Sequence, residues 1–440
     1  MQLTRAPRSA SVIVAIAWAL CVVAARAQSP SPWSLPPAPP VPPASPVPVA
    51  DLSAVPPASP PPVAAPSAAP PPAEPELGSD YVVHVSSEAA EYGDTDHVFV
   101  FTPSVTGSVA NPVAGWSVDG SYLVDVISAA SVDIVSTASR RWTEVRQAGT
   151  LEATYQPRSF GVTGSGAVSV EPDYVSWAAG LAVTQDLRFK NLTLYAGYDH
   201  EHDVAGRTGT PFSVYSHASD VDHAKAGLTV VVDRSTIATA FVEAEFVNGD
   251  TSKPYRYIPL FAPGTRVARG ASIDTVNALR LPERPIEQLP LTRNRYALTL
   301  RVARRFRSST LRVDQRFYDD TWGLEASSTD ARYLVDVSRR LELGPHARVH
   351  GQSAVDFWQL AYVLRPGFDV PAYRTGNREL GPLVNVTAGG SVRLGVGPDR
   401  APSQWTLELD LGATYSWYLD DLYIRDRVST LGGLSIEGEL

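Results

Sequence analysis

The sequence predicts an all-β chain that folds as a transmembrane, antiparallel, up-and-down β-barrel of about 16 strands. Three observations support this prediction. Apolar and polar residues alternate with period 2 along most of the chain, short and long connectors follow one another in turn, and aromatic residues stand near the ends of the alternating segments.

Segment 404–419, QWTLELDLGATYSWYL, shows the alternation most clearly. Its odd positions are apolar or aromatic, and its even positions are polar or small, including Glu408 and Asp410. Trp405 and Tyr415 are ten residues apart, which corresponds to roughly 25 Å along the membrane normal for a strand tilted by ~40°. We therefore expect Trp405, Tyr415 and Trp417 to form part of a lipid-facing aromatic girdle, with the carboxylates facing a wet interior.

Residues 1–27 have the features of a secretory signal peptide. Arg5 and Arg8 precede the apolar residues 11–25, and the small residues around Arg26 predict cleavage after Ala27. A lipoprotein signal at Cys21 is the less favoured alternative, since Leu20 stands where a small residue is expected. Cys21 is the only cysteine, so cleavage would leave a chain without disulfides or thiolate sites.

Residues 28–78 form a proline-rich tail that holds 20 of the 38 prolines. Proline at this density cannot pair into a sheet, and we predict a disordered segment of polyproline II character, with a tether into the cell wall as the alternative. Loss of three arginines with the signal peptide would take the formal net charge from −9 to −12. No basic stripe is present, so nucleic acid is not an expected partner.

Residues 79–440 are predicted to form the barrel. Fourteen segments alternate clearly, and residues 97–109 add a strand whose partner by parity is 81–92, which gives 16, with 14 as the fallback. In chain order the fourteen are 116–127, 145–155, 160–170, 175–183, 192–198, 224–232, 238–246, 296–302, 311–317, 331–337, 347–355, 384–394, 405–417 and 428–440.

The connectors provide independent support for a barrel in a bacterial outer membrane. Short connectors at 156–159, 233–236, 304–309 and 396–404 alternate with long ones at 199–222, 247–292, 318–330 and 356–380. No apolar run after the signal approaches eighteen residues, which excludes helical spans. We expect the N-terminal tail in the periplasm, and loop 247–292 either folded back into the lumen or lying outside as a cap or flap.

A soluble β-sandwich is the structural alternative, because its strands also alternate. The aromatic spacing and the charged opposite face favour the barrel. The last segment, 428–440, is amphipathic up to Leu440, and such a strand is expected to address the barrel assembly machinery.

Charged residues on the polar faces are predicted to line the lumen. Rows of both signs there could impose a transverse field on small polar solutes, or could simply pair and brace the wall. The predicted lumen-facing charges are Asp119, Asp125, Glu152, Arg301, Arg312, Asp314, Arg316, Arg332, Asp336, Arg348, Glu408 and Asp410.

Four of the eight histidines lie between residues 200 and 223, among several carboxylates. Imidazoles spaced H-x-H could hold Zn²⁺ or Cu²⁺, but a solvated external loop explains the same pattern. The weak metal candidates are His200, His202, His217 and His223, and we predict no specific metal site and no cofactor.

Several stretches resemble an uncharacterised bacterial family of outer-membrane β-barrels, a family of unknown function. They are VDVISAAS (124–131), SKPYRYIPLF (252–261), RYALTLRV (295–302), RFYDDTWG (316–323), QSAVDFW (352–358) and NREL (377–380). The resemblance implies location and architecture, and it implies no reaction.

These observations favour a porin-like channel for ions or small polar solutes, with outer-membrane lipids around it and an unspecified oligomeric state. The alternative is a non-conducting surface, adhesion or structural barrel with a filled lumen. A barrel-embedded hydrolase is the least favoured, since no G-x-S-x-G motif is present, and we expect no enzymatic activity.

Overall fold

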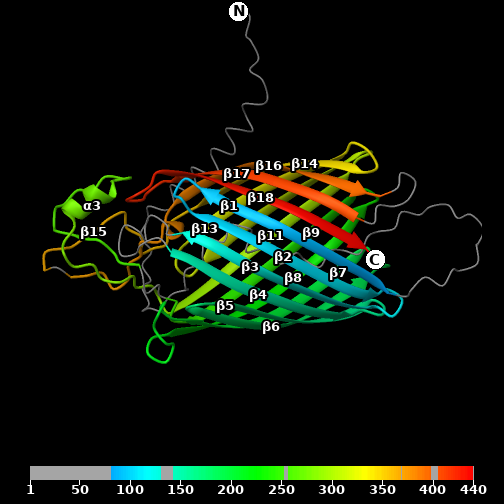
Figure 1. The fold of residues 1–440 in the computed structure, drawn as a ribbon, viewed down its shortest axis with the longest axis horizontal. Coiled ribbons are helices and arrows are strands. Elements are labelled where there is room, and N and C mark those ends of the chain that lie inside the picture. The colour runs from blue at the N-terminus through cyan, green and yellow to red at the C-terminus, as the bar shows by residue number, and fades with distance from the viewer. Residues whose placement is uncertain (1–80, 130–141, 252–255, 368, 398–404, 440) are drawn as a thin grey trace, which may run out of the picture.

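The computed structural model describes residues 81–129, 142–251, 256–367, 369–397 and 405–439. Sixteen strands pair antiparallel into one closed barrel, in which β1 and β18 meet to close the ring (Figure 1). The predicted 16-strand barrel is therefore confirmed, and the sandwich is wrong. The predicted signal peptide, its cleavage after Ala27, the proline-rich tail and Leu440 lie outside the described residues.

The barrel strands follow the chain order with one interruption at each of the two longest loops. They are β1 (Val82–Asp94), β2 (Phe99–Asn111), β3 (Trp116–Ala129), β4 (Trp142–Tyr155), β5 (Phe160–Glu171), β6 (Tyr174–Leu187), β7 (Leu192–Ala205), β8 (His217–Asp233), β9 (Thr236–Gly249), β11 (Thr292–Arg305), β12 (Ser309–Asp320), β13 (Glu325–Asp336), β14 (Leu341–Gln352), β16 (Leu383–Val396), β17 (Trp405–Tyr418) and β18 (Asp426–Glu439).

The outer surface of the barrel is apolar, and this follows directly from the period-2 pattern. On β17 the side chains of Leu407, Leu409 and Leu411 are 37–53% exposed, while Glu408 and Asp410 alternate with them on the inner face. A sheet that spans hydrocarbon must pair every backbone N–H and C=O within itself, and closure achieves this. Within the described residues, no helix has the length and apolar character needed to span a membrane.

The connectors at the end of the barrel where β1 begins and β18 finishes are short. We call the opposite end, which carries the long loops, the mouth. Between β2 and β3 the chain turns at Gly115, whose φ is +75° and where an added Cβ would lie 2.5 Å from the carbonyl oxygen of Gln156. A side chain here would collide with the neighbouring turn after β4, so only glycine fits.

Several strands run further than the sequence predicts; β13, for example, begins at Glu325 instead of 331, so the long connector predicted at 318–330 is wrong and only the loop 321–324 remains. The largest difference concerns β7 and β8. The alternation in 192–198 and 224–232 led us to assign 199–222 to an external loop, but β7 continues to Ala205 and β8 begins at His217. Charged residues occupy both faces of this extension, which hides the period-2 signal. Cross-strand pairs such as His200 opposite Asp222 keep the strands in register beyond the apolar band.

The described parts of the two longest loops, 250–291 and 353–382, fold together outside the barrel and, with 419–425, form what we call the cap (Figure 1). It contains a parallel pair of two-residue strands, β10 (Leu260–Phe261) and β15 (Tyr362–Val363), the helix α3 (Ile273–Leu279) and a 3-10 turn, η1 (Arg378–Leu380). Phe261, Ile258 and Leu260 are at most 2% exposed, so the cap has its own apolar core. Of the two predicted placements of loop 247–292, the structure shows the external one.

A lipid-facing charge should be far more costly than a lumen-facing one on the same strand. We expect Leu409→Arg to destabilise the folded barrel by about 2–4 kcal/mol, because the guanidinium would enter hydrocarbon near the middle of β17. Asp410→Arg is the matched control and should cost much less, since its side chain points into the lumen. Urea unfolding in lipid vesicles, followed by heat-modifiable gel mobility, measures both, and equal losses would contradict the assignment of faces.

Candidate functional site

All twelve charged residues predicted to line the lumen lie on the inward rows of their strands. Each alternates with an outward row that contains exposed apolar side chains, such as Val118 beside Asp119 and Leu300 beside Arg301. The candidate functional site is therefore the inner wall of the barrel and its outer mouth.

Strands β11–β14 place a basic sector on this wall. Asp314 accepts two hydrogen bonds from Arg301, at 2.8 and 2.9 Å, and one of 2.6 Å from Nη2 of Arg312, so two cations share one carboxylate. The neighbouring Arg316 pairs with Glu243 of β9. Because arginine cannot lose its charge in this setting, the sector keeps a surplus of positive charge at any physiological pH.

The inward cations remain in contact with water. The side chain of Arg332 is 47% exposed and lies 3.5 Å from Asp330, and that of Arg393 is 46% exposed while it pairs with Glu437. Among the described residues, Arg348 has no ion-pair partner. Asp336 pairs with Arg305, so bracing of the wall also occurs. Because Arg332 and Arg393 are nearly half exposed, their charges are not desolvated as they would be in a packed interior.

Strands β3–β7 form an acidic sector. Asp119 lies opposite Glu152 in the register of β3 and β4, and Asp125 pairs at 3.0 Å with Arg146, the one basic residue of the inward rows in the described parts of these strands. Asp199, Glu201 and Asp203 follow closer to the mouth on the inward row of β7, whereas inward Asp186 lies at the other end of the sector, where Gln156 of the turn after β4 donates to it.

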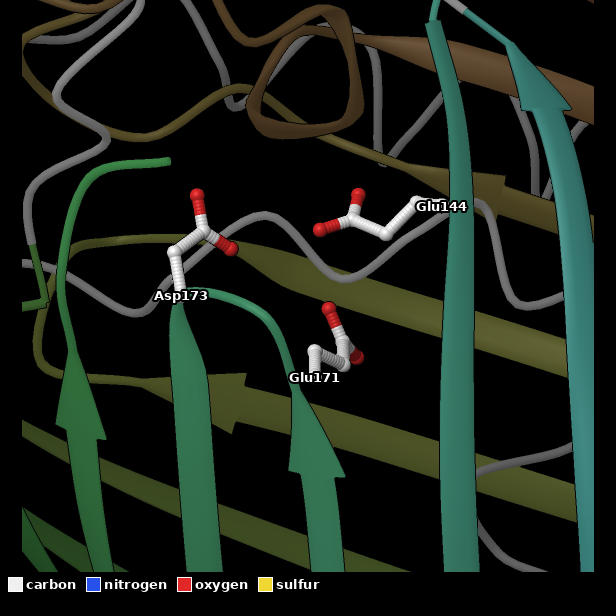
Figure 2. Close-up of side chains that lie close together, drawn as sticks. All are labelled: Glu144, Glu171 and Asp173. Atoms are coloured by element: carbon white, nitrogen blue, oxygen red, sulfur yellow. The ribbon is translucent and has the colours of Figure 1, made fainter. Parts of the chain in front are cut away.

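The sector ends in a carboxylate triad that the sequence prediction missed. Glu144, Glu171 and Asp173 each bring an oxygen within 4.8 Å of the others, at the turn between β5 and β6 (Figure 2). Asp173 also accepts hydrogen bonds from the N–H and hydroxyl of Thr208, at 3.0 and 2.6 Å. The feature of the sequence that indicates this cluster is the two-residue connector after Glu171, because it places Glu171 and Asp173 together at the end of the barrel that carries the long loops.

The acidic and basic sectors lie on different sides of the ring. In the barrel order β8 and β9 separate them on one side, and β16, β17, β18, β1 and β2 separate them on the other. On this second side, inward Glu408 lies 4.0 Å from Arg393, and Asp410 follows it along β17. A solute in the lumen would thus have an acidic wall on one flank and a basic wall on another.

The four candidate metal histidines do not form one site. His217 and His223 point inward, where His217 pairs with Asp250, and His223 lies 3.9 Å from both Glu201 and Glu245. His200 and His202 belong to the outward row of β7 and contact Asp220 and Asp222 instead. The reason is the strand period, because residues of odd and even number fall on opposite faces of the wall.

A serine and a histidine are in contact on the inner wall. Ser328 lies 2.7 Å from Nδ1 of His350, and the other ring nitrogen lies 3.2 Å from the amide oxygen of Gln352. In a hydrolase triad a carboxylate occupies the position of Gln352 and stabilises the imidazolium, which an amide cannot do. The pair of Ser328 and His350 therefore lacks the third group of such a triad.

Buried ion pairs lie where the cap meets the barrel. The Asp320 carboxylate is fully buried and accepts from Arg293 at 2.5 Å, from Tyr318 at 2.7 Å and from the N–H of Trp322 at 2.8 Å. Arg378 of η1 pairs at 2.5 Å with Asp96, between β1 and β2, where burial raises the pKa of Asp96 above its usual range.

Two of the stretches quoted for the family resemblance meet at this junction. Gly323 has a φ of +81°, and an added Cβ would lie 2.3 Å from a carboxylate oxygen of Asp356. Trp322 packs edge-on against Phe357, with ring centroids 5.5 Å apart. The loops 321–324 and 353–382 therefore hold each other rigidly at the mouth.

The predicted girdle residues lie on the outer face of β17. Tyr415 and Trp417 are in contact with ring centroids 4.3 Å apart and planes tilted by 53°, and the Tyr415 hydroxyl donates a 2.6 Å hydrogen bond to Asp426. Trp405 is 38% exposed at the other end of the strand. This position of amphipathic rings is typical of a membrane interface.

A closed barrel with an apolar outer wall, interfacial rings and a charged interior is an integral outer-membrane β-barrel. The chain belongs to the family described as "Protein of unknown function (DUF3570)", whose model matches residues 103–396, from β2 to the end of β16. No curated protein matches the sequence.

Solved structures give only remote similarity. A bacterial polysaccharide outer membrane secretin is 10% identical with a TM-score of 0.42, over 82% of this chain and 98% of that one. The siderophore receptor PirA from Pseudomonas aeruginosa is 10% identical with a TM-score of 0.40, over 80% and 61%. OccK3 (OpdO) from Pseudomonas aeruginosa is 9% identical with a TM-score of 0.38, over 82% and 96%.

The buried pair of Asp320 on β12 with Arg293 on β11 should hold the strand ends from which the loops 250–291 and 321–324 emerge. We expect Asp320→Asn to cost about 3–5 kcal/mol of local stability, because Arg293 would remain buried without its counter-charge. Trypsin cleavage within 250–291 of the folded barrel should therefore accelerate strongly. Asp319→Asn, the exposed neighbour, is the matched control, and cleavage at the wild-type rate in Asp320→Asn would refute this role.

Proposed function

We propose that this protein is a porin-like channel through which ions or small polar solutes diffuse passively across the outer membrane. The N-terminal tail would lie in the periplasm, since β1 begins at the end of the barrel that has the short turns. Membrane lipids would surround the apolar wall, and the amphipathic strand β18 would address the barrel assembly machinery.

The observation that carries the proposal is the exposure of charged side chains inside the ring. The inward residues Arg332, Arg393 and Glu408 are 39–47% exposed. The apolar clusters of the described residues lie in the cap and at the mouth, around residues such as Trp322 and Tyr92, and not across the lumen. A lumen filled by its own wall would bury these groups, whereas an aqueous path leaves them hydrated.

The two sectors suggest how the channel would select. A dipolar or zwitterionic solute would gain by turning its positive end to Asp119 and Glu152 and its negative end to Arg301 and Arg312. Each contact between solute and wall is weak because it forms in water. Weak contacts suit a channel, since a tightly bound solute would not leave.

A second candidate is a surface protein that does not conduct, and the cap favours it. The cap holds a buried pair between Arg256 and Glu287 and a narrow cleft lined by Tyr257, Trp358, Tyr362 and Tyr423, among other residues. A packed extracellular unit of this kind is suited to contact molecules outside the cell. We propose no catalytic role for either candidate.

Planar-bilayer recording separates the two candidates. The purified barrel should insert with stable ohmic conductance steps if the lumen is open. A correctly folded barrel that remains silent would refute the channel and leave the surface protein.

Removal of two lumen cations should change the ion selectivity. We expect Arg312→Ala with Arg316→Ala to shift the reversal potential in a salt gradient towards cation preference, because the acidic sector would then dominate the field. Arg304→Ala is the control for position, since it removes an arginine from the outward row of β11 and leaves the inward charges intact. An unchanged reversal potential in the double variant would exclude a filter at this sector.

A further inference from the structure

A second cluster of ionisable residues lies on the lipid side of the barrel wall, near its outer rim. It consists of His200 and His202 on β7 and Asp220 and Asp222 on β8, and we call it the outer His–Asp cluster. These residues share the outward rows with exposed aromatic residues such as Trp177 and Tyr198. The cluster therefore stands at the level of the interfacial rings and takes no part in the lumen.

Asp220 lies between the two imidazoles. Its Oδ1 is 2.7 Å from Nδ1 of His202 and 3.8 Å from Nε2 of His200. Two histidines at positions i and i+2 of a strand point to the same side, and a carboxylate from the paired strand completes a three-residue arc. This combination of two nitrogens and one oxygen is a common donor set for transition metals.

The remaining carboxylate, Asp222, orients one of these histidines. Its Oδ1 lies 2.9 Å from Nδ1 of His200, which directs Nε2 of that ring towards Asp220. Asp222 is itself held by a 2.5 Å hydrogen bond from the hydroxyl of Tyr198. A carboxylate that fixes the second nitrogen of a histidine is the usual support for a metal-ligating imidazole.

The aromatic ring of Trp177 restricts both imidazoles further. Its centroid lies 5.7 Å from that of His200 and 6.1 Å from that of His202. The rings therefore rest on a fixed surface, which lowers the entropy lost when they bind a ligand.

We propose that the outer His–Asp cluster binds one divalent transition-metal ion of the Zn²⁺, Ni²⁺ or Cu²⁺ class. The ligands are Nε2 of His200, Nδ1 of His202 and a carboxylate oxygen of Asp220, and Asp222 is a positioning residue. As the side chains stand, these atoms do not all lie within 4.8 Å of one another, so binding draws the two rings together around Asp220. Water completes the coordination on the exposed side.

Two neighbouring clusters offer different donors. The carboxylate triad of Glu144, Glu171 and Asp173 has oxygen donors alone, which suit hard cations. On the inner face, His223 lies 3.9 Å from each of its two glutamate neighbours. The strand period prevents the inward histidines from joining His200 and His202, so the set with two nitrogen donors from neighbouring positions of one strand belongs to the outer face.

Calorimetric titration of the mature, untagged chain, folded in detergent micelles, tests the site. Zn²⁺ and Ni²⁺ should each bind with one ion per chain, and Ca²⁺ should not compete. We expect His200→Ala with His202→Ala, and separately Asp220→Asn, to weaken Zn²⁺ binding by more than about 100-fold. Asp222→Asn should weaken it by about 10–100-fold, the range typical of a supporting residue.

The control is His217→Ala with His223→Ala, which removes two histidines from the inner face of β8 and should leave the affinity unchanged. Absorption of bound Co²⁺ provides a readout of nitrogen ligation that a merely structural role would not change. If the double alanine variant does not fold, His202→Gln replaces it. Absence of saturable binding by the wild type, or equal binding by the outward variants, would overturn the proposal, and neither result bears on conductance.

Discussion

The structure depends on one constraint, namely that no backbone polar group can remain unpaired in hydrocarbon. The pairing of β1 with β18 meets this constraint for the whole ring, because it leaves no edge strand. Once the ring is closed, period-2 alternation assigns the side chains of the strands either to the apolar outer wall or to the interior of the barrel. Leu409 and Asp410 are adjacent in the chain, yet one faces outward and the other faces the charged interior.

Beyond the membrane the chain must form a core by other means, and the cap shows how. Its loops bury their own apolar residues, such as Phe261, and Arg378 links them to the barrel rim through a buried pair with Asp96. A pair such as Arg293 with Asp320 fixes geometry more than it adds stability, since desolvation offsets much of the attraction. The mouth of the barrel is thus held in one arrangement, in which loops 250–291 and 353–382 are parts of one folded unit.

The strands and the inward charges could be predicted from sequence because alternation and connector length are local properties. The same local reasoning failed between 199 and 222, where charges occupy both faces and the pattern no longer separates lipid from water. It also grouped four histidines that the strand period distributes over two faces. The cap was beyond such reasoning, since contacts such as Arg378 with Asp96 join residues 282 positions apart. The Glu144, Glu171 and Asp173 triad needs the register of β4 with β5 and the turn that follows β5, which no single segment contains.

The sharing of Asp314 by Arg301 and Arg312 limits how far the wall can influence the lumen. Paired charges act at a distance as dipoles, and only the uncompensated guanidinium contributes a long-range field. Mobile ions in 0.15 M salt reduce such a field over a Debye length of about 8 Å, which is short compared with the width of a sixteen-stranded lumen. Selection of solutes by charge would therefore be confined to a thin layer of water along the arginines. The rate at which a solute passes along the barrel axis would depend little on its charge.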